Sequence, residues 1–271
     1  MTTLLESAPP LTADLVESTV SVPEALRPWL TELAHIPTVT DVSTPFTHVP
    51  QTATTIVLRT EQSGRRDALV LGPQTRAVYS VTDKPAGCSR LRLAPGATRQ
   101  LLGVPAIELA DRVFRLADLP GVIADLADEL TALNHDELFP YLEAVLPHRI
   151  SEDSTQRAHR RLLRSAVASI SGAAPAPVHE LATALAVSER QLRNLFTAGI
   201  GVSPKHFARI GRVRTVLAHA GNTPWAQIAA GAGYYDQSHM SSDFRALMGV
   251  PPASFLRGEL PAPTPCHAPG I

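Results

Sequence analysis

Cysteine and long apolar runs are what this sequence of 271 residues lacks most clearly. It holds two cysteines, Cys88 and Cys266, whose wide separation fits a reduced intracellular protein better than a disulfide scaffold. No stretch reaches about 18 uninterrupted apolar residues, the length that a membrane-spanning helix needs. Residues 1–20 carry acids and prolines but no lysine or arginine, which excludes a signal peptide. The sequence therefore predicts a cytoplasmic protein with no membrane partner and no disulfide.

Lysine is also scarce, since Lys84 and Lys205 are the only two lysines among 24 basic residues. The formal net charge of −1 hides an uneven distribution. Residues 1–150 hold 12 basic and 18 acidic residues, a balance of −6, whereas residues 151–271 hold 12 and 7, a balance of +5. A basic half indicates either a polyanionic partner or a solvated surface, and the charge alone leaves both open.

The period of the apolar residues changes along the chain. Residues 23–36 have the spacing of a short helix, and four short runs at 52–60, 67–73, 76–82 and 89–96 alternate like strands between turn dipeptides. These runs predict an antiparallel sheet or a small barrel. Helical spacing returns at 104–116 and 121–146, and the stripe of Val122, Leu126, Leu130 and Leu133 predicts a buried helix face or a dimer seam.

These patterns predict an α+β fold with a β-rich N-terminal domain followed by an all-α C-terminal domain. We divide the chain into a disordered tail (1–20), a β-rich sensor or dimerisation domain with C-terminal helices (21–150), an all-α domain (156–258) and a disordered proline-rich tail (259–271). An arginine-rich amphipathic helix at 156–170 is expected to begin the second domain.

One device occurs twice in the C-terminal part, a short helix followed by a tight turn and a longer helix. Ser188 is expected to cap the first longer helix in a capping box with Gln191, and Asp236 to cap the second. Between them, Ser203 with Pro204 and Thr223 with Pro224 mark two more helix starts, of which the first opens a joining helix. The sequence predicts two helix-turn-helix units joined by one helix.

The two longer helices present similar polar faces opposite their apolar sides. At 100° per residue, Leu192, Leu195 and Phe196 face one way in the first helix, and Met240, Phe244 and Leu247 do so in the second. Such polar faces are typical of helices that read base edges in the major groove, and also of any solvated helix face. The candidate DNA-binding residues are Arg190, Arg193, Asn194, Thr197, Gln237, Ser238, His239, Ser241, Ser242 and Arg245.

Residues 160–258 resemble the AraC/XylS family of bacterial transcription regulators. The motif residues are those of both longer helices and both turns: Ser188, Arg190, Leu192, Phe196, Gly201, Ser203, Pro204, Ile228, Ala229, Gly233, Tyr234, Asp236, Ser238, His239, Phe244, Gly249 and Pro252. The resemblance implies two helix-turn-helix units bridged by a helix over about 204–219, with both recognition helices in successive major grooves of double-stranded promoter or operator DNA.

Residues 45–120 resemble the N-terminal domain of one uncharacterised branch of these regulators, through FTHVP, LVLGPQTR and RLAPGATRQLLGVPAIELADRV. This resemblance implies a cupin-like sensor or dimerisation module. His48 is the only histidine between residues 40 and 130, so a catalytic metal site is not predicted. The Pro265-Cys266-His267 triplet resembles the nucleophile motif of DNA alkyltransferases, but no domain surrounds the thiol. No catalytic residue, cofactor or effector-binding residue is identified.

Asn194 and Ser242 stand where the family pattern often has arginine, which removes a cation from each recognition helix. An alternative function is therefore a protein-interaction adaptor on a decayed DNA-binding fold. The function we expect is a sequence-specific DNA-binding transcription regulator, controlled by a small-molecule effector or by dimerisation through its N-terminal domain. RNA polymerase, a small-molecule effector and a second copy of the chain are the other candidate partners.

Overall fold

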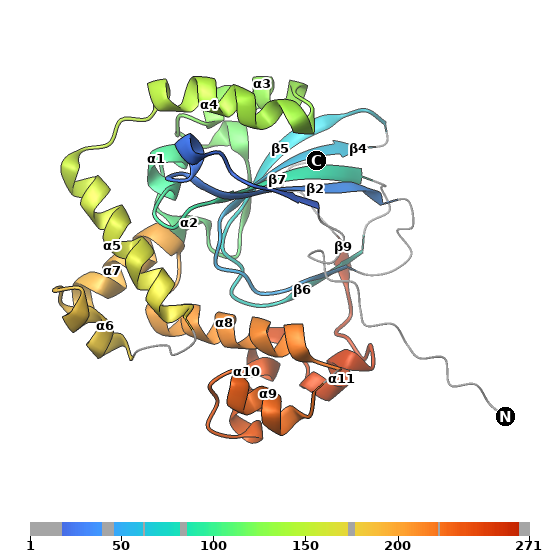
Figure 1. Ribbon diagram of the computed structural model, residues 1–271. Coiled ribbons are helices and arrows are strands. Elements are labelled where there is room, and N and C mark those ends of the chain that lie inside the picture. Colours follow the sequence, from blue (N-terminus) through green and yellow to red (C-terminus); the bar gives the residue numbers. More distant parts are fainter. Residues whose placement is uncertain are drawn as a thin grey trace.

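A computed structural model describes residues 18–39, 46–61, 63–81, 86–172, 177–221 and 223–265. Figure 1 shows strands and short helices in the N-terminal part and helices alone from α5 (Ser154–Ile170) to α11 (Pro252–Leu256). The predicted α+β class, with a β-rich N-terminal domain and an all-α C-terminal domain, is confirmed.

The N-terminal domain is built on a six-stranded antiparallel sheet in the order β1-β2-β7-β4-β5-β8. Three of the four predicted strand runs lie in it. In the central strands Ile56 lies opposite both Val70 and Leu91, and all three side chains are completely buried. Alternating side chains thus turn one face of the sheet to the core. The strands are β1 (Ser18–Val20), β2 (Leu30–Val39), β4 (Thr55–Glu61), β5 (Arg66–Leu71), β7 (Ala86–Leu93) and β8 (Val113–Arg115).

Short helices complete the core of this sheet: α1 (Thr98–Leu102), α2 (Ala106–Leu109), α3 (Ala127–Ala132) and α4 (Leu138–Arg149). Figure 1 shows α3 and α4 across the top of the domain. In the predicted stripe, Leu126 and Leu130 are buried in the same cluster as Leu142 and Leu146, and Leu133 is half-buried against it. Three residues of the stripe therefore belong to the core, and Val122 is half-buried.

Two helix predictions in this domain are wrong. Residues 23–36 form only one turn of 3-10 helix (Glu24–Leu26), and then β2 begins at Leu30. Strand β2 pairs with β1 on one side and with β7 on the other, so tertiary hydrogen bonds override a local helical spacing. The run at 104–116 likewise splits into α2 and β8, because Val113–Arg115 pairs with β5.

A second, small sheet brings the C-terminal end of the described chain beside two strands of the N-terminal domain. Its strands are β3 (Phe46–His48), β6 (Val78–Val81), which is the fourth predicted run, and β9 (Thr264–Pro265). The tail predicted at 259–271 thus contributes a strand parallel to β6, and the tail predicted at 1–20 contributes β1. Backbone hydrogen bonds to neighbouring strands order these two segments, although their amino-acid composition predicted disorder. Residues 1–17 and 266–271, with Cys266, lie outside the described residues.

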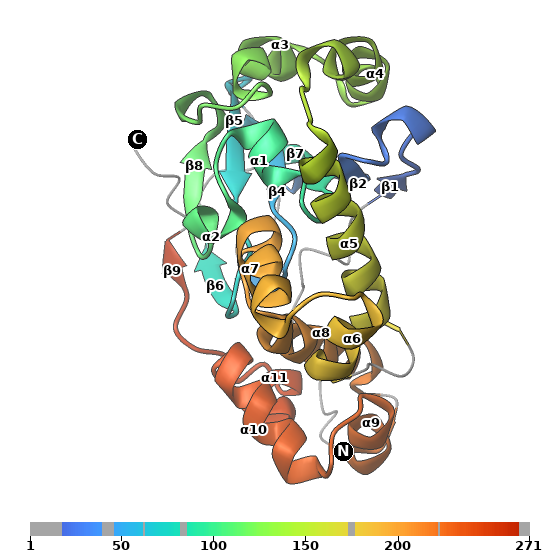
Figure 2. The ribbon, with the colours of Figure 1, turned by 90° about the vertical axis from the view of Figure 1, so that its left-hand side faces the viewer.

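The C-terminal domain contains two separate apolar cores. Besides α5 and α11 its helices are α6 (Val178–Ala184), α7 (Glu189–Ile200), α8 (Pro204–His219), α9 (Trp225–Gly231) and α10 (Gln237–Met248). The first core gathers side chains of α5, α6 and α7, and the second those of α8 to α11. Helix α8 runs between the two units (Figures 1 and 2). Among the described residues no helix combines the length and apolarity required to traverse a bilayer.

Candidate nucleic-acid interface

The first unit, α6 and α7, has the geometry of a helix-turn-helix. Its turn is closed by hydrogen bonds from Ala186 N to Thr183 O and from Val187 N to Ala182 O, both 3.0 Å long. Ala186 adopts the left-handed conformation, with φ +53°, which is rare for a residue with a side chain. Ser188 then caps α7 by accepting a hydrogen bond from Gln191 N at 3.1 Å, which is the Ser188 half of the predicted capping box.

The predicted polar face of α7 is open to solvent. Arg190, Arg193 and Asn194 are exposed and Thr197 is half-buried, whereas Leu192 and Phe196 on the opposite side are completely buried. Arg193 forms an ion pair with Glu189 one turn earlier on the same helix. An exposed pair of this kind contributes little to stability, and its guanidinium stays within reach of an outside anion. The anchored apolar side therefore fixes where these polar groups point.

The second unit, α9 and α10, repeats this arrangement with small differences. Its left-handed residue is Gly233 (φ +74°), and Asp236 caps α10 by accepting from His239 N at 2.7 Å. Helix α9 begins after Pro224, and the predicted cap by Thr223 is wrong because Pro224 still has the extended conformation of a cap residue. Gln237, Ser238, His239, Ser242 and Arg245 are exposed, and Ser241 is half-buried. Met240, Phe244 and Leu247 are buried behind them.

The turn of the second unit contains one residue more than the turn of the first. Tyr234 N bonds to Ala229 O as Val187 N bonds to Ala182 O, so Tyr235 is the additional residue before the cap. Its side chain is 94% exposed, the most exposed large hydrophobic side chain in the described part of the chain. An exposed aromatic ring with a hydroxyl beside a recognition helix is a candidate contact to the DNA backbone. The comparison of the two turn lengths could have revealed it in the sequence.

Charged contacts fix α10 on the joining helix α8. Asp243 accepts hydrogen bonds from Arg209 Nε at 3.0 Å and from Arg212 Nη2 at 3.2 Å. Burial raises the pKa of Asp243, but the hydrogen bonds from the two arginines outweigh that effect and leave the pKa below its ordinary value. Arg212 also lies over the ring of Tyr234 at 5.0 Å. The carboxylate thus stays ionised and holds α10 at a set orientation to α8.

A pocket of about 300 Å³ lies inside the N-terminal domain, between the sheet and the helices that follow it. His35 and His135 meet there with ring centroids 4.8 Å apart, and Ser89 Oγ lies 3.2 Å from His135 Nδ1. Burial, together with the charge of His35, lowers the pKa of His135. Both histidines lie outside residues 40–130, where His48 is the only histidine, and the pairing of distant segments brings them together.

Reactive or metal-binding groups are not prominent among the described residues. Cys88 lies at this pocket, and burial raises the pKa of its thiol to about 12, so almost none of it is thiolate at neutral pH. No group of three or more histidine, cysteine, aspartate or glutamate side chains in the described ranges is arranged to hold a metal ion. The polar faces of α7 and α10 remain the most distinctive site.

Comparison with known proteins identifies the C-terminal domain. Residues 181–258 match the family model described as a helix-turn-helix domain, and no curated protein matches the chain. One similar solved structure is the C-terminal domain of the response regulator AraT from Geobacillus stearothermophilus, with 24% identity over 41% of this chain and 93% of that chain and a TM-score of 0.33. Another is a probable AraC family transcriptional regulator from Rhodopseudomonas palustris, with 25% identity over 39% of this chain and 99% of that chain and a TM-score of 0.31. ToxT from Vibrio cholerae aligns over 79% of this chain and 92% of its own (14% identity, TM-score 0.38). These TM-scores are low, so the family model carries the assignment.

Proposed function

We propose that the chain, whose residues 181–258 form an AraC-type helix-turn-helix domain, regulates transcription by binding specific promoter sequences. The observation that carries the proposal is the pair of exposed polar faces on α7 and α10, each opposite a buried apolar side. A helix presented in this way fits the major groove of B-form DNA. The proposed location is the cytoplasm, because promoter DNA is the partner.

Each helix takes one half of the proposed site. Arg190, Arg193, Asn194 and Thr197 of α7 read one segment of the major groove, and Ser238, Ser241, Ser242 and Arg245 of α10 read the next. Gln237 and His239 flank the groove-facing side of α10 at its first turn and contact phosphates, together with Tyr235. With one helical turn of DNA between the segments, a single chain covers sites about 34 Å apart.

The absence of a cation at Asn194 and Ser242 has a consequence for affinity. Each arginine that neutralises a phosphate adds to affinity and to its salt dependence, so this domain binds with a shallower salt slope than one with arginines at both positions. Asn194 can still form two hydrogen bonds with an adenine, and the serines can form hydrogen bonds with more than one kind of base. Specificity then depends on Arg190, Arg193 and Arg245 for guanine.

The test is a footprint of the full-length protein on DNA upstream of its own gene and of neighbouring genes, at several salt concentrations. We expect protection of two adjacent major-groove segments that weakens steeply as salt rises. Twice that length would indicate a homodimer. Binding that is independent of sequence, or no binding, would contradict the proposal and favour the protein-interaction adaptor.

Regulation is the second half of the proposal, with the N-terminal domain as the sensor. Its support is contact: the N-terminal domain touches both helix-turn-helix units through backbone hydrogen bonds, from Gly96 N to Gly199 O (3.0 Å) and from Ala77 N to Leu247 O (2.8 Å). A reporter gene behind the protected promoter tests it, with Arg193→Ala as the control whose DNA binding is weakened. Higher expression than the control identifies an activator that recruits RNA polymerase, lower expression identifies a repressor, and equal expression would contradict regulation.

A further inference from the structure

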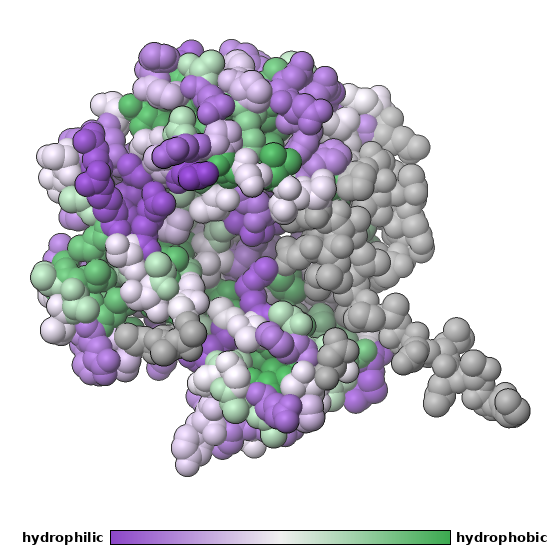
Figure 3. Space-filling model, viewed as in Figure 1, coloured by the Kyte–Doolittle hydropathy of each residue, from purple (hydrophilic) through white to green (hydrophobic). Residues whose placement is uncertain are grey.

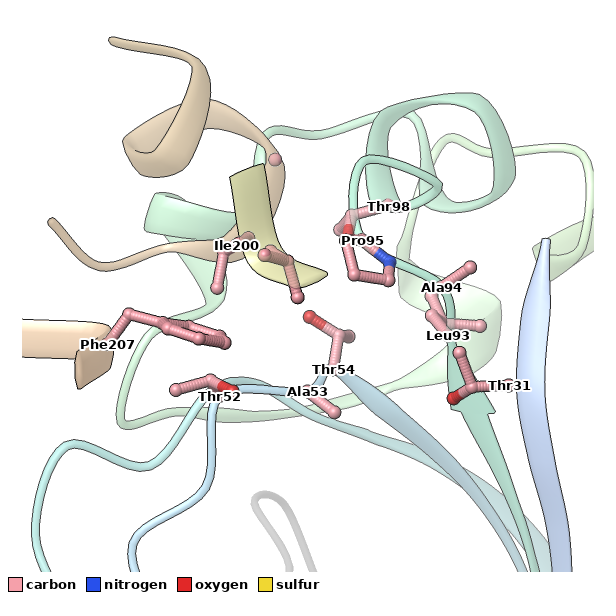
Figure 4. A pocket seen from close by; sticks show the side chains of 12 residues that line it. Thr31, Thr52, Ala53, Thr54, Leu93, Ala94, Pro95, Thr98, Ile200 and Phe207 are labelled. Carbon is pink, nitrogen blue, oxygen red and sulfur yellow. The ribbon is translucent and has the colours of Figure 1, made fainter. Parts of the chain in front are cut away.

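A cavity of about 150 Å³ lies where the N-terminal sheet meets the first helix-turn-helix unit (Figure 4). Ile200 and Phe207 lie on one side of it, and Thr54, Pro95 and Thr98 on the other (Figure 4). Its helical wall comes from α5, α7 and α8, through Val167, Ile200 and Phe207. Ile200 ends α7, so the recognition helix of the first unit forms part of this wall.

The junction beside the cavity leaves little freedom for α7. Gly96 N donates to Gly199 O at 3.0 Å, and a Cβ added to Gly199 would lie 2.4 Å from Leu163 Cδ2 and 3.2 Å from Gly96 Cα. Gly201, which ends the helix with φ +90°, has equally little room, since its Cβ would lie 2.8 Å from Ala106 O. The last turn of α7 is thus seated on the N-terminal domain at backbone distance, and a change in the neighbouring cavity reaches this helix directly.

The chemistry of the wall limits what can bind. None of the described residues that line the cavity is an aspartate, glutamate, lysine, arginine or histidine. An ion placed there would lose its hydration without a partner, which is strongly unfavourable. The polar side-chain groups that line the cavity are threonine hydroxyls. Two of these threonines, Thr54 and Thr98, are buried and belong to different segments of the chain. A cavity of about 150 Å³ holds a molecule the size of benzene.

We propose that this cavity is a binding site for an uncharged molecule of one ring with a single hydroxyl or amide group, and that its occupancy sets the position of α7. The proposal rests on the proposed function for its consequence, the regulation of DNA binding. The pocket at His35 and His135 is larger, but its lining belongs to the N-terminal domain alone, so a ligand there has no direct contact with a recognition helix. Of these two pockets in the described part of the chain, the junction cavity is the one whose lining includes residues of α7.

Binding is tested first on the full-length protein without DNA, with phenol as the probe and benzoate as the charged control, by isothermal titration calorimetry. We expect saturable binding of phenol and none of benzoate. Thr54→Val removes one hydroxyl from the cavity at nearly constant side-chain volume. It should lower the affinity for phenol about fivefold, which corresponds to the usual contribution of one hydrogen bond. Thr55→Val is the matched control, because Thr55 is buried in the next position, its hydroxyl has no partner, and it does not line the cavity.

A second variant separates a lost site from a misfolded chain. Val167→Phe, on α5, fills the cavity from the helical side and should abolish phenol binding while the near-ultraviolet circular dichroism keeps its native form. Equal binding of phenol and benzoate, equal effects of Thr54→Val and Thr55→Val, or unchanged phenol binding by a folded Val167→Phe protein would each overturn the site.

The consequence is tested on the promoter fragment identified by footprinting. Phenol should change DNA affinity by a factor equal to the factor by which DNA changes phenol affinity, since linkage is reciprocal. Phenol binding with no change in DNA affinity would overturn the control of α7 and leave the proposed DNA-binding function intact. Failure of the footprint both without and with phenol would overturn the proposed function and leave the calorimetric result for the site standing.

Discussion

The two helix-turn-helix units look alike in sequence but are held differently in the molecule. The first unit has a core of its own, in which Leu163, Leu192 and Phe196 are buried among residues of α5 to α8. The second unit shares its core with the N-terminal domain, since Val49 and Tyr79 are buried in the same cluster as Phe244. Tyr79 Oη also donates to Met248 O at 2.6 Å, at the end of α10.

A repeated local pattern therefore does not imply a repeated environment. Both units have a left-handed turn residue, a capped second helix and a buried phenylalanine. The second unit nevertheless depends on the small sheet, whose third strand follows its last helix in sequence. Removal of residues 1–150 would therefore take away part of its core, and regulation is better studied with substitutions in the full-length chain.

Loss of either of the two buried phenylalanines should destabilise the protein most. Phe196→Ala and Phe244→Ala should each lower the free energy of unfolding by about 3 to 5 kcal/mol, because each leaves a cavity in a closed core. Hydrogen exchange distinguishes them: Phe244→Ala should increase the exchange of the amides of Ala77 and Val78–Val81, and Phe196→Ala should not. Equal exchange of these amides in both variants would show that the small sheet is no part of the second core.

Arg193→Ala, on α7, should weaken DNA binding by about 1 to 3 kcal/mol if the Arg193 side chain forms hydrogen bonds with a guanine. Glu189→Gln should have the opposite sign, since it frees Arg193 from its ion pair and removes a negative charge from the face proposed to meet DNA. Binding to the promoter fragment and to single-base variants measures both. A loss of the same size on every sequence would make Arg193 a phosphate contact, and weaker binding by Glu189→Gln would exclude competition by Glu189.

Tyr79→Phe addresses the junction of the second unit alone. It removes the hydrogen bond to Met248 O in a buried place and should lower the free energy of unfolding by on the order of 1 kcal/mol. The burial that raises the pKa of Tyr79 to about 12 also means that its hydroxyl stays protonated as a donor. Tyr235→Phe is the control, and its exposed ring should leave stability unchanged in denaturant titrations. A similar small effect of both variants would mean that the bond contributes nothing.

The smallest effects concern the left-handed residues of the two turns. Gly233→Ala should destabilise the protein by about 1 kcal/mol for conformational reasons alone, because a Cβ at Gly233 meets no atom within 4 Å. Ala186→Gly should be neutral or slightly stabilising, because it relieves the same conformation in the first unit. If Gly233→Ala left the denaturation midpoint unchanged, the turn would not require this conformation.

Local patterns made the helical domain predictable. The caps at Ser188, Ser203 and Asp236 lie where the sequence placed them, and the polar faces of α7 and α10 follow from helical periodicity. Prediction failed where distant segments pair. Residues 30–36 have a helical spacing and form a strand, and the histidine pair of the N-terminal pocket unites segments a hundred residues apart.

Local sequence was thus sufficient to predict two helix-turn-helix units and the exposed polar faces of α7 and α10, because each depends on neighbours within one or two helical turns. Only the tertiary structure decided that Tyr79 completes the second unit, that β9 joins the small sheet and that a cavity lies against the end of α7. These features arise where surfaces distant in sequence meet, and no local pattern encodes which surfaces those are.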